Sequence, residues 1–338
     1  MIAPLAKYLD WWAIQFLTRM LPPALGSNPR LEEAIQFLNG PDFIPAESSP
    51  AQIKFEGPKH FHFPSPRPGN FAENNIVPGR LYRCAKRWQE RPVIILLHGG
   101  GDFINHRIRF PLIARRCNRA GFNAATIELP YHFQRSPGRL SNDATLNEGP
   151  AFPFSAARRL KERNIFRMAE AMAQGVADIR ALTGWLLAEG CPTVALWGYS
   201  LGGWLAGMTA CRDARIASIV LTAPGVRLNF EFAKLCLQPQ IRKLGKTGIA
   251  AFEALNRTPL NLTGVKPMIA VENILLMEAK HDLLVRENDV EALWQAWSQP
   301  EIWRLPHGHI SWMLAPGINR RVLEWLAPRV NQRPCPQV

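Results

Sequence analysis

Several features that mark other classes of protein are missing from this sequence. Its six cysteines lie far apart, with no C-x-x-C pair and no zinc-finger spacing, which excludes the usual structural zinc sites and thioredoxin-like redox motifs. There is no uncharged apolar run of about 18 residues, so no membrane-spanning helix is expected. The amino terminus lacks the basic region, apolar core and small-residue cleavage site of a secretory signal. These absences predict a cytoplasmic protein with reduced, mostly buried thiols.

The acidic residues are too few to balance the basic ones. Lys and Arg number 40 against 27 Asp and Glu, a net charge of +13. Such an excess attracts anions, and it favours acidic substrates, anionic lipid surfaces or nucleic acid. The basic residues are scattered in short groups rather than gathered into one block, so nucleic-acid binding is not expected. Peripheral contact with an anionic membrane remains open as a partner, and the oligomeric state is left undetermined.

The first 40 residues are predicted to form a helical segment separate from the main domain at 41–338. Residues 5–20 carry large apolar side chains at helical spacing and on other faces too, which suggests burial, and Pro22 and Pro23 end the helix. Two interpretations stay open. The helix packs on the main domain, or it serves as an interfacial anchor or a cover over an active-site entrance.

The rest of the chain, 338 residues in all and 47% apolar, alternates apolar runs with helical patterns. Continuous apolar runs are typical of strands buried on both faces of a parallel sheet. Short extended runs among the prolines and glycines of 41–80 predict antiparallel edge strands. The fold class is therefore α/β, a mostly parallel, doubly wound sheet with antiparallel N-terminal strands. Expected strands cover 59–63, 76–83, 93–97, 124–129, 194–197, 216–222, 274–279 and 302–305, and expected helices 108–119, 165–188, 204–211, 290–297 and 320–327.

Two segments, at about 133–160 and 226–272, interrupt this alternation. They are the candidates for cap insertions over the carboxyl edge of the sheet. Their apolar residues would line a substrate pocket, and their surplus cations would favour an ester that bears an anionic group or is presented at an anionic lipid surface. The alternative is that these charges only keep the cap soluble. The cations are Arg135, Arg139, Arg158, Arg159, Lys161, Arg163, Arg227, Lys234, Arg242, Lys243 and Lys246.

One short motif carries chemistry. The run from Gly198 to Gly203 reads G-Y-S-L-G-G and matches G-x-S-x-G. It follows a predicted buried strand and opens a predicted helix, which is the setting that a nucleophile elbow requires. So tight a turn needs neighbours without side chains, which accounts for Gly198 and Gly202. Ser200 is therefore the candidate nucleophile.

A serine hydroxyl needs a base, and that base needs a carboxylate to orient it. In this kind of fold the chain order is Ser, then Asp or Glu, then His. His309 follows the last predicted strand and is preferred as the base, because Gly308 before it permits close approach to the serine; His307 is the alternative. Asp282 lies just beyond strand 274–279 and is preferred to Asp289 as the acid.

The segment His98-Gly99-Gly100-Gly101 follows strand 93–97. Turns of this H-G-G-G type present bare backbone N–H groups to a developing negative charge. The candidate oxyanion-hole donors are the N–H of Leu201 and that of Gly100 or Gly101. His98 is expected to serve as a structural hydrogen-bonding residue of the turn. No metal or cofactor is expected.

These segments, in this order, resemble the α/β-hydrolase superfamily from about residue 60 to 328. The run Ile127-Glu128-Leu129-Pro130-Tyr131-His132, with Arg135 and Pro137 beyond it, is also similar to a segment of the domain-18 type of α/β-hydrolase. The chain departs from that type at Leu201, where Met would be expected. The narrower resemblance implies a lipid-like ester as substrate.

The leading hypothesis is a serine hydrolase that cleaves a small-molecule or lipid-like carboxylic ester through an acyl-enzyme. The alternatives are an acyltransferase that uses the same three residues and a catalytically silent binding protein of the same fold.

Overall fold

The computed structural model describes residues 2–20, 31–100, 102–136, 165–228 and 250–331, and within these ranges nine strands form one sheet. Their order across the sheet is β1-β2-β3-β5-β4-β6-β7-β8-β9. The bounds are β1 Lys54–Glu56, β2 His60–Pro64, β3 Ile76–Tyr82, β4 Val93–Leu97, β5 Asn123–Ile127, β6 Val194–Tyr199, β7 Ile216–Thr222, β8 Ile274–Ala279 and β9 Glu301–Leu305.

The sheet is mixed, as the sequence predicted. Strands β1, β2, β3 and β5 pair antiparallel in succession, whereas β5, β4, β6, β7, β8 and β9 are parallel neighbours. The parallel strands β4 to β8 are buried along almost their whole length, which accounts for their continuous apolar sequences. Because parallel strands end at the same edge, the loops after β4, β6, β8 and β9 meet there.

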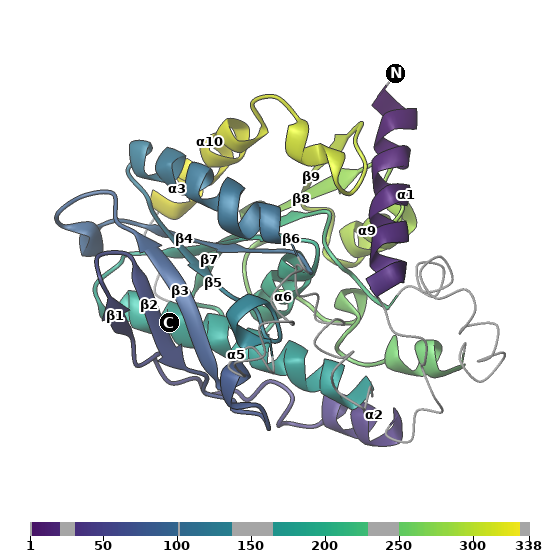
Figure 1. Ribbon diagram of the computed structural model, residues 1–338, viewed down its shortest axis with the longest axis horizontal. Helices are drawn as coiled ribbons and strands as arrows, with labels where there is room; N and C mark the ends of the chain where they lie inside the picture. The colour runs from purple at the N-terminus through teal and green to yellow at the C-terminus, as the bar shows by residue number, and fades with distance from the viewer. Residues whose placement is uncertain (1, 21–30, 101, 137–164, 229–249, 332–338) are drawn as a thin grey trace.

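Helices cover both faces of the sheet (Figure 1). On one face α5 packs against α2 and α6, and α9 joins the same apolar core; α3 and α10 pack on the other face. The bounds are α1 Ile2–Met20, α2 Leu31–Asn39, α3 Phe110–Arg119, α5 Ile165–Ala188, α6 Leu201–Ala210, α9 Glu287–Ala296 and α10 Ile318–Asn331. A π-helical turn at Asn105–Arg109 precedes α3, and a 3-10 turn at Ser311–Leu314 precedes α10.

Most predicted elements lie within a few residues of the observed ones, and β4, β7, β8 and α5 have the predicted bounds. Two short elements were missed, α2 and β1. The helix α2 has Glu32 and Glu33 in its first turn and buries Ala34 and Leu38, one turn apart. With nine residues it is too short for periodicity to identify.

The prediction that the first helix is buried is wrong for its described side chains. Leu5, Tyr8, Trp11 and Trp12 of α1 are more than half exposed, while Ala6, Asp10 and Ile14 are buried. Residues four apart share one face of a helix, so α1 docks through a narrow stripe with a carboxylate at its centre. Among the described residues, no helix is long and apolar enough to cross a bilayer.

Of the two expected cap segments, the first lies mainly outside the described residues, and the second lacks only 229–249. Of the second segment, the described part packs beside α6 and α9. The indole Nε1 of Trp297 donates to the carbonyls of Leu262 and Val265, and that of Trp204 donates to Leu260. Of the first, only residues 133–136 are described; they follow β5 after the five residues 128–132 and begin with a 3-10 turn at Phe133–Arg135. The division into an N-terminal segment and a capped main domain stays a prediction.

Candidate active site

Ser200 lies between the end of β6 and the start of α6, with φ 53° and ψ −114°. Few residues other than glycine adopt a positive φ, and such strain persists only where neighbouring contacts hold it. Here the N–H of Ser200 donates to the carbonyl of Thr222 at 3.0 Å, and its carbonyl accepts from Trp204 and Gly225 at 2.9 and 3.0 Å. The turn therefore holds the serine at the carboxyl edge of the sheet.

Two glycines make this turn possible because the backbone approaches itself too closely for a side chain. A Cβ at Gly198 would lie 2.2 Å from the carbonyl oxygen of Gly202. One at Gly202 would lie 2.3 Å from the carbonyl oxygen of Leu97, at the end of β4. Both distances are far shorter than any real contact, so these positions require glycine for the reason that the motif indicated.

The structure brings Ser200, His309 and Asp282 together from three loops at this edge. The imidazole Nδ1 of His309 lies 2.6 Å from Asp282 Oδ2, and its Nε2 lies 3.0 Å from Ser200 Oγ. A carboxylate only accepts, so Nδ1 carries the hydrogen and Nε2 presents its lone pair to the serine hydroxyl. The other oxygen of Asp282 accepts the N–H groups of Leu284 and Val285 at 2.7 and 2.8 Å.

The two candidate bases, His307 and His309, differ in burial and in backbone hydrogen bonds. His309 is buried, and its backbone carbonyl accepts the hydroxyl of Tyr199 at 2.7 Å. The carbonyl of His307 instead accepts the N–H of His281. Burial, together with His281, lowers the pKa of His307. The geometry favours His309 as the partner of the serine.

The charge around His309 is negative. Burial alone would lower its pKa, but the carboxylates of Asp282, Asp10 and Asp102 outweigh burial and raise the pKa above its usual value. A positive imidazolium is therefore stabilised at this position.

The turn after β4 lies against the serine. An ideal Cβ on Gly99 would be 3.3 Å from Cβ of Ser200. Gly100 follows in the same turn, whereas Gly101 lies outside the described residues. On the other side of Ser200, Leu201 is the first residue of α6. The first N–H groups of a helix have no partner within the helix, so the N–H of Leu201 can serve a bound oxyanion.

His98 holds this turn in place, as the sequence indicated. Its Nδ1 donates to the carbonyl of Gly99 at 2.8 Å, and its Nε2 accepts the N–H of Leu129 at 3.0 Å. Burial and the neighbouring His132 and His106 lower its pKa well below the usual value. A neutral His98 with both nitrogens engaged is a structural residue.

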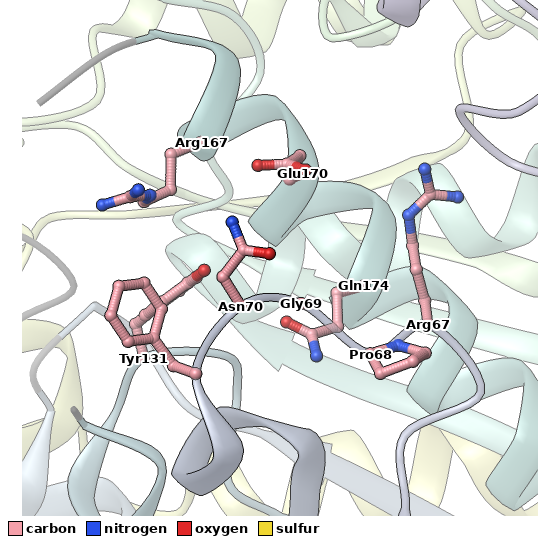
Figure 2. A pocket seen from close by; sticks show the side chains of 9 residues that line it. Arg67, Pro68, Gly69, Asn70, Tyr131, Arg167, Glu170 and Gln174 are labelled. Carbon is pink, nitrogen blue, oxygen red and sulfur yellow. The ribbon is translucent and has the colours of Figure 1, made fainter. Parts of the chain in front are cut away.

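Two cavities lie apart from the serine. One, of about 30 Å³, is formed by residues 67–71, Tyr131 and the first half of α5, and is lined by polar groups such as Glu170 and Gln174 (Figure 2). It has room for about two or three water molecules, too little for a substrate. The other, of about 400 Å³, is lined by residues that include His60, His106 and Glu128. Neither lining contains Ser200, His309 or Asp282.

The described residues include no cluster of three or more His, Cys, Asp or Glu placed to hold a metal ion. The cysteines at 84, 117, 191 and 211 are unpaired, and burial raises the pKa of the last three to about 12. Those thiols are therefore protonated near neutral pH and poorly nucleophilic.

The family model for the alpha/beta hydrolase family matches residues 94–333, more than half of the chain. The chain belongs to this family. Solved structures with the same fold include acetyl xylan esterase 1 from Thermoanaerobacterium (TM-score 0.56, 14% identity, 93% of this chain and 98% of that one). An esterase of Pyrococcus furiosus is also similar (TM-score 0.50, 16% identity, 92% of this chain and 100% of that one). At such low identity these likenesses show the fold.

Two curated proteins from different strains of Mycobacterium tuberculosis are 28% identical to this α/β hydrolase over 207 residues. Both are described as uncharacterised. The match covers 60% of this chain and 45% of each relative, so the chain spans less than half the length of the curated relatives it matches.

Two of the cations expected to rim a cap pocket have other roles in this hydrolase. Arg135 is fully buried, pairs with Asp178 at 2.8 Å and donates to the backbone carbonyls of Asn74 and Glu128. Arg227 pairs with Asp289 of α9 at 2.6 Å. For Arg135 the expectation is wrong, because its side chain is fully buried in an ion pair. For Arg227, whose side chain is 38% exposed, it stays a prediction. The other nine lie outside the described residues.

Sequence reasoning missed Asp10, which is buried against the loop that carries His309. The available signal was local: Asp10 is the single acidic residue between positions 2 and 20, with Ala6 and Ile14 one turn away on the same face. An acid between two apolar residues on one face of an apolar helix indicates a specific buried contact, but not which loop it meets.

Proposed function

We propose that this α/β hydrolase cleaves carboxylic esters through an acyl-enzyme on Ser200. The observation that carries the proposal is the continuous hydrogen-bonded series from Asp282 through His309 to Ser200, at 2.6 and 3.0 Å, on a strained strand–helix turn. Each member has the partner that its role needs: the acid orients the base, and the lone pair of the base meets the hydroxyl.

In the proposed reaction Ser200 Oγ attacks the ester carbonyl while its proton passes to His309 Nε2. The imidazolium, stabilised by Asp282, then gives that proton to the departing alcohol, which leaves an acyl group on the serine. Water enters with His309 again as base, and the carboxylic acid is released. The N–H groups of Leu201 and of Gly100 or Gly101 would stabilise the negative oxygen of each tetrahedral intermediate.

Two esterases among the structures that share the fold agree with ester chemistry, as their names state. Both are distant in sequence, so they do not identify the acyl group or the alcohol of the substrate. A lipid-like ester, which the resemblance of the run 127–132 to the domain-18 type of α/β-hydrolase implies, is one class to include among the substrates tested.

The test is labelling with a serine-directed fluorophosphonate, followed by a series of p-nitrophenyl esters of increasing chain length. Wild-type protein should be labelled and active. Ser200→Ala should lose both, with hydrolysis reduced on the order of thousands-fold or more. Ser49→Ala, which changes an exposed serine before β1, should behave as wild type.

Unlabelled wild-type protein, or ester hydrolysis retained in Ser200→Ala, would refute the proposal. Product analysis with an added alcohol separates hydrolysis from acyl transfer, because transfer yields a new ester in place of the free acid.

A further inference from the structure

The carboxylate of Asp10 joins the two loops that carry the proposed base and acid. Its Oδ2 accepts the backbone N–H of His309 at 2.7 Å and that of Leu283 at 3.1 Å. Its Oδ1 accepts the N–H of Ile310 at 2.9 Å. Leu283 follows Asp282 directly, so one side chain holds the backbone beside both partners of Ser200.

This carboxylate is a main feature of the face through which α1 docks. Asp10 is completely buried, with Ala6 and Ile14 on the same face, while Tyr8 and Trp11 remain exposed. Burying an ionised carboxylate is costly unless hydrogen bonds replace its water, and the three N–H groups supply that replacement. A leucine at this position would meet the need for apolar burial without that cost, so the acid points to a role beyond packing.

The contact of Asp10 with the backbone requires a residue without a side chain at Gly308. A Cβ there would lie 2.7 Å from Asp10 Oδ2 and 2.9 Å from its Cγ. The glycine was expected to let the base approach the serine. The structure gives a different reason: it lets Asp10 approach the backbone. Gly308 is not among the glycines with a positive φ, so contact with Asp10, and not backbone conformation, excludes a side chain.

The segment is held from its other side as well. The hydroxyl of Tyr199 donates to the carbonyl of His309 at 2.7 Å, and Ser311 Oγ accepts the N–H of Gly308 at 2.9 Å. Burial, with Asp102 and Asp282, raises the pKa of Tyr199 well above its usual value, so its hydroxyl remains a donor. Both backbone polar groups of His309 are thus engaged, the N–H by α1 and the carbonyl by β6.

We propose that Asp10 is a positioning residue for the base: it fixes the backbone of His309 against the loop of Asp282, so that the imidazole reaches Ser200. This inference rests on the proposed function. It assigns the N-terminal helix a part in the active site, as a brace that is needed for full activity.

The same carboxylate also contributes charge. Burial and the nearby Asp282 raise the pKa of Asp10, while His309 and the N–H groups of Ile310 and His309 oppose that rise. The titratable and charged groups around His309 are Asp282 after β8, Asp10 on α1, Asp102 after β4 with Arg109 beside it, and Tyr199 on β6. Asp10 is one of the three carboxylates that raise the pKa of His309.

The first test is Asp10→Asn, which keeps the shape but removes the charge and turns an N–H donor toward one of the three N–H groups. We expect kcat for a p-nitrophenyl ester to fall between about ten- and a hundred-fold, with KM little changed, because the base is displaced rather than the substrate site. The acid limb of the pH profile should move to lower pH, since His309 loses a stabilising negative charge.

Glu32→Gln is the matched control, because it removes the same charge from an exposed position on α2. It should leave kcat and the pH limb unchanged. An unchanged kcat and limb in Asp10→Asn, or an equal effect in the control, overturns the proposal. Thermal melts of each variant establish that it is folded.

The second test changes Gly308, the other partner of the Asp10 contact. It also applies if Asp10→Asn does not fold. Gly308→Ala should displace the Asp10 carboxylate and lower kcat, whereas Asp10→Ala makes room for the added methyl group. The double variant should therefore be no slower than Asp10→Ala alone, because both changes remove one contact. Losses that multiply overturn the proposal.

The third test does not depend on hydrolysis. In a Ser200→Ala background, proton NMR follows the Nδ1–H of His309 and the titration of its ring, with and without Asp10→Asn. We expect a lower pKa and faster exchange of the Nδ1 hydrogen without Asp10, and no difference overturns the inference. If fluorophosphonate labelling fails while this coupling is observed, the fault lies with the proposed function and not with the contact.

Discussion

Replacing Asp282 by Asn tests the proposed roles most directly, because both oxygens of its carboxyl have identified partners among the described residues. One oxygen accepts the N–H groups of Leu284 and Val285, and the other accepts the Nδ1 hydrogen of His309. An Asn side chain must place its NH2 group at one of these two sites. With its NH2 group against the backbone, the Asn would face two N–H donors and leave both without an acceptor. These hydrogen bonds are partly buried, so each loss would cost up to about 1–3 kcal/mol. Against His309 the NH2 group faces a single nitrogen.

The second orientation is therefore favoured, and it changes the tautomer of the imidazole. An NH2 group beside Nδ1 requires Nδ1 to accept, so the hydrogen moves to Nε2, which faces Ser200 at 3.0 Å. That nitrogen can no longer take the proton of the serine. The expected loss in kcat near neutral pH is about ten-thousand-fold, as a wrong tautomer causes in serine proteases. This corresponds to about 5 kcal/mol in the activation free energy.

The loss in kcat is measured by following hydrolysis of a p-nitrophenyl ester. The rate of fluorophosphonate labelling should fall in parallel. Because the variant keeps the shape of the side chain and both backbone hydrogen bonds, its thermal unfolding should stay close to that of wild type. A loss smaller than about ten-fold in a folded variant, well below the wrong-tautomer figure, would show that Asp282 does not orient His309.

Three further predictions concern the same edge of the sheet. His309→Ala should be as inactive as Ser200→Ala, whereas His307→Ala should stay near wild type; the reverse ranking in an ester assay would make His307 the base. Gly202→Ala should lower the free energy of unfolding by about 1–3 kcal/mol in a urea titration, because the added methyl meets the backbone of β4, and wild-type stability would contradict that packing. The base must be neutral to act and its pKa is raised, so kcat/KM should rise with pH through a midpoint above about 6.5, the ordinary histidine value; a midpoint below it would contradict the negative surroundings of His309.

Local sequence was sufficient for the parts of the fold in which neighbouring residues decide the outcome. The runs at β4, β7 and β8 are continuous and apolar because those strands are covered on both faces. The predicted ends of two elements were wrong. The helix expected to begin at 108 is an α-helix only from Phe110, after a π-helical turn at Asn105–Arg109, and the strand expected to reach 129 ends at Ile127.

The pairing of Ser200 with His309 and Asp282 could also be expected from the sequence. In a parallel sheet the loops after successive strands share one edge, so residues that follow β6, β8 and β9 meet there whatever their separation in the chain. The position after β9 does not separate His307 from His309, because both are in one loop. The choice was made from Gly308, which the structure relates to Asp10 instead.

What the sequence by itself determined was the α/β class, the strained turn at Ser200 and the edge at which its partners gather. These follow from periodicity, from glycine where no side chain fits, and from the geometry of parallel strands. Only the tertiary structure decided that α1 docks through Asp10, whose contact with His309 spans 299 residues. Helical spacing shows which residues share a face, but the loop that this face meets depends on how distant elements pack. For the same reason the hydrogen bond from the hydroxyl of Tyr199 to the carbonyl of His309 could not be predicted from the sequence.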